Sequence, residues 1–98
     1  MAFNRARFSD AVAKSGLSMR ELGALYGVTR PTLYDWLDTG HPKHFTLDQW
    51  VGVVTEAILR AIDRHLLPFP RSLLRPARNE RIAKMRAALL ETKKTYAR

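Results

Sequence analysis

The chain has 98 residues, enough for one hydrophobic core at about 100–200 residues per domain. Hydrophobic residues make up 46% and charged residues 27%, which is typical of a globular domain and excludes a wholly disordered chain. Seventeen Lys and Arg against nine Asp and Glu give a net charge of +8, so nucleic acid or an anionic membrane surface is the expected partner. The absence of cysteine excludes disulfides and thiolate metal sites.

The positive charge is concentrated near the C-terminus. Residues 1–44 hold six basic and four acidic side chains, residues 45–66 hold two and three, and residues 67–98 hold nine and two. No apolar stretch approaches the roughly 20 residues that a membrane-spanning helix needs, and the N-terminal residues contain no apolar signal core. We therefore expect a cytoplasmic protein. A membrane surface is not the expected partner either, because the apolar stripe of the basic C-terminal segment is narrow and lacks Trp.

Hydrophobic periodicity predicts an all-α bundle of four to five helices, with no alternating strand. The first helix is predicted over about 4–15 and ends at Gly16, a residue favoured just after a helix C-terminus. The second begins with a capping box, in which Ser18 is the N-cap and Glu21 follows three residues later. It ends before Gly27.

A third helix is predicted over 29–39, with Thr29 as N-cap and Pro31 in the first turn, where no intrahelical N–H is needed. Gly27 stands where a tight turn between the second and third helices favours positive φ. Gly23 is expected where the two helices cross, because a larger side chain would push them apart. The apolar side chains expected in their shared core are Leu22, Leu25, Val28, Leu33, Trp36 and Leu37.

A long fourth helix is predicted over 46–66, opening with a second capping box made by Thr46 and Gln49. A proline-containing connector then leads to a basic C-terminal helix over about 77–94. The predicted apolar face of the fourth helix consists of Leu47, Trp50, Val51, Val54, Ile58, Ala61, Ile62 and His65. Trp36 and Trp50 lie on apolar faces, so both are expected in the core.

Two short helices joined by a glycine turn have the geometry of a DNA-binding helix-turn-helix. The matching positions are Leu17-Ser18, Glu21-Leu22-Gly23, Tyr26-Gly27-Val28-Thr29, Thr32-Leu33 and Trp36. On these residues the chain resembles the phage-repressor/Cro-type helix-turn-helix family over about residues 5–66. The resemblance implies a sequence-specific regulator of transcription, repressor-like, that binds double-stranded DNA with the helix over 29–39 in the major groove. It also implies a bacterial or phage-infected cell, with the protein associated with the nucleoid.

This resemblance assigns site residues. Base contacts are expected from the exposed start and middle of the third helix: Thr29, Arg30, Pro31, Tyr34 and Asp35. Arg30 is suited to guanine, and Asp35 is suited to the amino group of cytosine. Phosphate contacts are expected from Ser18, Met19, Arg20 and Thr32 in the motif, and from Arg78, Arg81 and Lys84 in the basic helix.

The chain is accordingly divided into a DNA-binding domain, residues 1–66, and residues 67–98, which hold the connector and the basic helix. This second part either belongs to the same domain or extends it for dimerisation or DNA-backbone contact. Helix-turn-helix proteins commonly bind two half-sites as two-fold dimers, so a homodimer is expected. The candidate dimer residues are Leu59, Leu66, Ile82, Met85 and Leu89, of which the last three form a narrow stripe that docks either on the fourth helix or on a partner.

A different class of function stays open. Asp35 and Asp38 would repel phosphate, and Leu59 and Leu66 lie outside the main apolar face of the fourth helix. These features favour a protein-interaction module on the same scaffold, either antitoxin-like or binding a host factor. Enzyme activity is not expected, because the sequence has no recognisable nucleophile motif, phosphate-binding glycine loop or paired carboxylates. We likewise expect no cofactor, no metal site and no small-molecule substrate.

Overall fold

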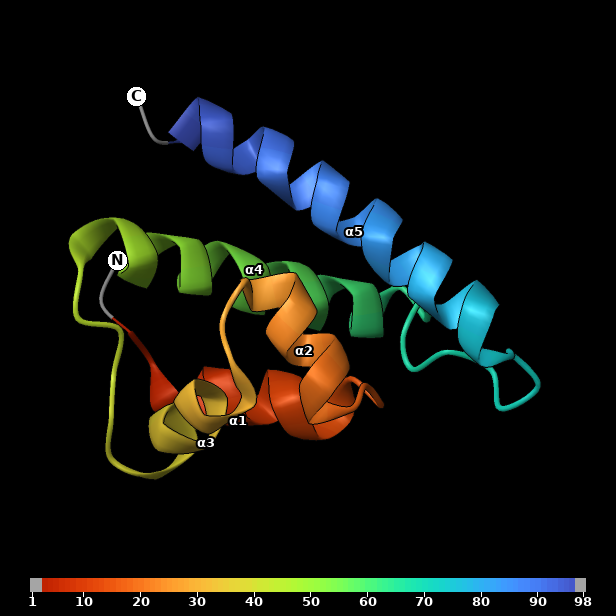
Figure 1. Ribbon diagram of the computed structural model, residues 1–98, viewed down its shortest axis with the longest axis horizontal. Helices are drawn as coiled ribbons and strands as arrows, with labels where there is room; N and C mark the ends of the chain where they lie inside the picture. Colours follow the sequence, from red (N-terminus) through yellow and green to blue (C-terminus); the bar gives the residue numbers. More distant parts are fainter. Residues whose placement is uncertain (1–2, 97–98) are drawn as a thin grey trace.

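A computed structural model describes residues 3–96, with side chains described through residue 91, and this part contains five helices and no strand (Figure 1). The helices are α1 (Arg5–Lys14), α2 (Met19–Tyr26), α3 (Arg30–Asp38), α4 (Phe45–Asp63) and α5 (Arg75–Tyr96). The predicted all-α bundle is confirmed. None of the described helices has both the length and the apolar character that crossing a membrane requires.

The ends of the first two helices follow the local signals in the sequence. Asn4 caps α1 by accepting a hydrogen bond from the backbone N–H of Arg7. The capping box of α2 is complete, because the Ser18 hydroxyl accepts from the Glu21 N–H and the Glu21 carboxylate accepts from the Ser18 N–H. Gly27 ends α2 in the left-handed conformation, with φ 74°. The predicted capping box and the predicted positive φ of Gly27 are confirmed.

Two predicted side-chain caps do not form. Thr29 stands at the N-cap of α3, but its hydroxyl pairs with the Thr32 hydroxyl at 3.0 Å instead of capping the helix. The capping box predicted from Thr46 and Gln49 does not form, because α4 begins earlier and has His44 at its N-cap. Thr46 is therefore already inside the first turn, where its side chain is exposed.

The boundary between α4 and α5 also shifts. α4 ends three residues before the predicted end, because His65 adopts a φ of 60°. The N–H groups of Leu66 and Leu67 then both donate to the carbonyl of Ala61, at 2.8 and 3.3 Å. α5 begins two residues before its predicted start, because its first turn accommodates Pro76, as proline allows at that position.

The core is built around aromatic side chains from four helices. The Phe8 ring contacts the Tyr26 ring edge-on at a centroid distance of 5.4 Å and the Trp36 ring at 5.9 Å. The indole N–H of Trp50 donates to the carbonyl of Tyr26 at 2.8 Å, and the Tyr26 hydroxyl pairs with that of Thr55 at 2.8 Å. Both tryptophans are buried, as predicted.

α5 joins this core through its narrow apolar stripe. Ile82 and Leu89 are buried, and Met85 is partly buried against the same cluster. α5 packs against α2 and α4 and runs across the bundle (Figure 1). Of the two docking sites predicted for this stripe, the structure shows the one within the chain, on α4, with α2 in addition. Ile82 and Leu89 are thereby covered, so their assignment as dimer contacts is corrected. Side chains from Leu67 to Leu90 share one hydrophobic core with those of the described residues before position 67.

Candidate nucleic-acid interface

The turn between α2 and α3 is tight because two positions lack side chains. The N–H groups of Gly27 and Val28 both donate to the carbonyl of Gly23, at 2.8 and 3.0 Å. A Cβ atom at Gly23 would lie 2.8 Å from the carbonyl oxygen of Val28, whereas the nearest side-chain atom of α3, in Leu33, would be 3.9 Å away. Glycine at position 23 thus permits the approach of α2 to the turn rather than to α3 itself.

α3 presents one side to solvent and the other to the core. Leu33 and Trp36 are buried, whereas the Tyr34 side chain is 57% exposed. All five predicted base-contact residues lie on the exposed surface, at the N-cap or along α3: Thr29, Arg30, Pro31, Tyr34 and Asp35. All five side chains are therefore accessible along the solvent-facing side of α3 and its N-cap.

The two edges of this surface have different surroundings. Thr29 and Arg30 line a groove over the α2–α3 turn, on the side of α5. Pro31 and Asp35 line a separate groove against the loop that follows α3. The Asp35 carboxylate lies so close to Gly40 that any Cβ there would overlap it. Its negative charge is thus held at the end of α3 distant from the turn.

Most of the predicted phosphate contacts in the motif have other roles. The Ser18 hydroxyl caps α2, the Met19 side chain is partly buried against the core, and the Thr32 hydroxyl pairs with that of Thr29. Arg20 is exposed and has no ion-pair partner among the described residues. Of the four, Arg20 is the side chain suited to a phosphate.

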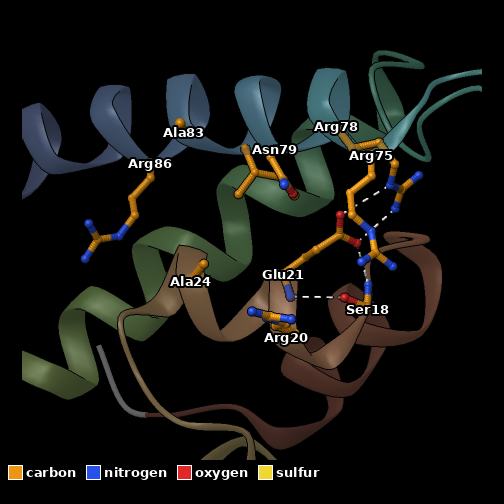
Figure 2. A pocket seen from close by; sticks show the side chains of 10 residues that line it. Ser18, Arg20, Glu21, Ala24, Arg75, Arg78, Asn79, Ala83 and Arg86 are labelled. Atoms are coloured by element: carbon orange, nitrogen blue, oxygen red, sulfur yellow. Dashed lines mark hydrogen bonds and ion pairs between the residues drawn. The ribbon is translucent and has the colours of Figure 1, made fainter.

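Arg78 forms an ion pair across the α2–α5 contact. Its Nη2 lies 2.9 Å from Oε1 of Glu21 and its Nε lies 3.2 Å from Oε2 (Figure 2). Partial burial raises the pKa of Glu21, but the hydrogen bonds from Arg78 and from the Ser18 backbone outweigh it, and the pKa lies below its ordinary value. Arg78 was predicted to contact phosphate. This prediction is corrected, because the N–H donors of the Arg78 guanidinium are already used by the partly buried carboxylate of Glu21.

Arg81 and Lys84 lie on α5 but outside the groove that α5 forms with α2. The Arg81 guanidinium stands over the Phe69 ring, 5.7 Å from its centroid, and the Lys84 ammonium is 3.4 Å from the Glu80 carboxylate. Both side chains are exposed. The structure does not bring these two predicted phosphate contacts to the α2–α3 turn.

The α2–α5 groove contains two arginines that the sequence prediction did not select, Arg75 and Arg86. It has a volume of about 680 Å³, and its basic lining residues are Arg20, Arg75, Arg78 and Arg86. Arg86 extends from α5 toward the segment that joins α2 to α3 (Figure 2), and its Nη2 is 3.5 Å from where a Cβ of Gly27 would stand. A signal existed in the sequence: Arg86 follows Ile82 by four residues, so both lie on the same side of a helix.

The remaining dimer candidates also differ in accessibility. Leu59 is partly buried and packs against the core. Leu66, just after α4, is 62% exposed. Of the predicted dimer residues, Leu66 is thus the one whose side chain is largely accessible.

Comparison of the chain with protein-family models, with curated proteins and with solved structures found no match. Its function is therefore inferred from its own residues and their geometry.

Proposed function

We propose that this protein is a sequence-specific, double-stranded DNA-binding regulator of transcription, repressor-like, which places α3 in the major groove. The observation that carries the proposal is the exposed surface of α3, with Arg30, Pro31 and Tyr34 side by side on a short helix anchored by Leu33 and Trp36. The glycine turn and the resemblance to phage-repressor/Cro-type proteins support it. The bacterial nucleoid is the proposed place of action.

The chemistry of base recognition follows from the donors on α3. The Arg30 guanidinium offers two parallel N–H groups that match O6 and N7 of guanine, a pattern unique to the major groove. The exposed Tyr34 ring is suited to apolar contact with a thymine methyl group. Regulation would follow from occupation of an operator, and a two-fold dimer would contact two half-sites one helical turn apart, at about 34–36 Å.

The first prediction tests base recognition. Selection of bound duplex fragments should yield a preferred sequence. Arg30→Ala should cost about 1–3 kcal/mol of binding free energy and relax preference mainly at one base pair. The matched control, Arg20→Ala, removes the same charge from α2 and should weaken all sequences alike. Sequence preference that survives Arg30→Ala unchanged would contradict the placement of α3.

The rival interpretation gives a different result in the same assay. Asp35 and Asp38 remain exposed on α3, as a protein partner would require. A protein-interaction module with incidental affinity for DNA should bind random and selected duplexes equally, and should release both when salt is raised from 50 to 200 mM. Saturable binding with a sequence preference favours the regulator.

A further inference from the structure

Arg20 and Arg86 each line both of two adjoining grooves. One groove lies between α2 and α5, and the other lies over the α2–α3 turn and has Arg30 at its far edge. α5 therefore extends a basic surface from its own flank to the first residue of α3. Three helices contribute one arginine each to this surface.

The charge of this surface is not neutralised within the described part of the chain. No acidic residue lines the groove over the turn. Glu21 is the acidic residue that lines the α2–α5 groove, and Arg78 already pairs with it. Arg20, Arg30 and Arg86 have no ion-pair partner among the described residues. An external anion would therefore meet attraction from all three guanidinium groups.

The floor of the groove over the turn is also suited to an anion. Ala24 and Gly27, which line this groove and are exposed, carry little or no side chain, so a ligand can approach the backbone closely there. The Thr29 hydroxyl does not cap α3, so it leaves the first-turn N–H groups of that helix without a side-chain acceptor. The positive end of the α3 dipole thus faces the region where Arg30 stands.

We propose that Arg20 and Arg86 bind a phosphate of the DNA backbone over the α2–α3 turn, beside the base pairs that α3 contacts. This inference rests on the proposed function and assigns α5 a direct contact with DNA. Arg78 is a positioning residue: its ion pair with Glu21 fixes α5 on α2, and Arg86 follows about 12 Å along the helix.

The test compares two arginines of the same helix. Arg86→Ala removes the proposed contact, whereas Arg81→Ala removes an equal charge outside the groove. For Arg86→Ala, the slope of log K against log salt for the selected duplex should decrease by about 0.9 per subunit, the value for one lost phosphate contact. When salt is raised from 50 to 200 mM, the factor by which this variant loses affinity should be about 3.5 times smaller than the factor for the parent chain. Arg81→Ala should keep the parent slope.

A second measurement does not depend on DNA recognition. Inorganic tripolyphosphate should shift the guanidinium Nε–H resonances of Arg20 and Arg86, and Arg86→Ala should weaken its binding more than Arg81→Ala does. Equal salt slopes for the two variants, with sequence preference intact, would overturn the phosphate site and leave the proposed function standing. A parent chain that lacks sequence preference but shows the tripolyphosphate difference would overturn the regulator and retain an anion site.

Discussion

Gly23 lies inside α2, where glycine is normally unfavourable, because the turn after α2 leaves no room for a side chain. Alanine stabilises a helix interior relative to glycine by about 1 kcal/mol, yet here its Cβ would lie 2.8 Å from the Val28 carbonyl oxygen. Because that oxygen belongs to the backbone of the turn, relief of the contact requires α2 and the turn to separate. The position therefore constrains how α3 is held.

Gly23→Ala should lower the free energy of unfolding by about 1–3 kcal/mol, the usual cost of overpacking, despite the gain in propensity. Ala24→Gly, at the neighbouring exposed position, should lower the free energy of unfolding by only about 1 kcal/mol, because glycine has a lower helix propensity than alanine. Urea unfolding measures both. An unfolding midpoint that is unchanged or higher in Gly23→Ala would contradict the close approach at the turn.

The Arg78–Glu21 ion pair connects α5 to the capping box of α2 across 57 positions of sequence. The same carboxylate accepts hydrogen bonds from the Ser18 N–H and from Arg78. The pKa of Glu21 is lower in the folded chain than its ordinary value of 4.5, so folding favours the ionised form. This stabilisation is present above about pH 4.5 and is lost as the pH falls through the folded value.

Arg78→Ala should therefore lower the free energy of unfolding at pH 7 by about 1.5–3 kcal/mol, the usual range for hydrogen bonds to a charged group. It should also reduce the loss of stability between pH 7 and pH 3. Lys84→Ala is the control, because its exposed pair with Glu80 is worth only about 0.3–0.5 kcal/mol. Equal pH dependence in Arg78→Ala and the parent chain would contradict this account of Glu21.

The packing of α5 separates contacts that build the fold from surfaces left for assembly. Ile82 and Leu89 are covered inside the chain, so their substitution would test folding rather than dimer formation. Leu66 lies between α4 and α5 and remains exposed. An assembly contact at Leu66 would leave the core unaltered.

Leu66→Asp should shift the proposed dimer toward monomer in sedimentation, while the free energy of unfolding changes by no more than about 0.5 kcal/mol, as is usual for surface positions. Ile82→Ala should instead cost about 2–4 kcal/mol of stability through a cavity in the core. A parent chain that sediments as a monomer at all concentrations, free and bound to DNA, would contradict the dimer.

Local features of this chain were predictable because each depends on residues within one or two helical turns. The capping box at Ser18, the left-handed Gly27 and the apolar faces of α2 and α3 are of this kind. The start of α4 was missed because His44 and Thr46 both stand near a possible N-terminus, and side-chain chemistry alone favoured the wrong one.

The roles of the C-terminal arginines were decided by tertiary packing. Arg78, Arg81 and Arg86 belong to one basic helix. The four-residue spacing from Ile82 places Arg78 and Arg86 on its side of the helix, but it does not specify that this side packs against α2. That choice depends on the docking of Ile82 and Leu89 into the core, which orients α5 about its axis. Once the helix is docked, Arg78 meets a carboxylate, Arg81 meets an aromatic ring and Arg86 reaches the α2–α3 turn, because burial of the apolar stripe determines the direction of every other side chain.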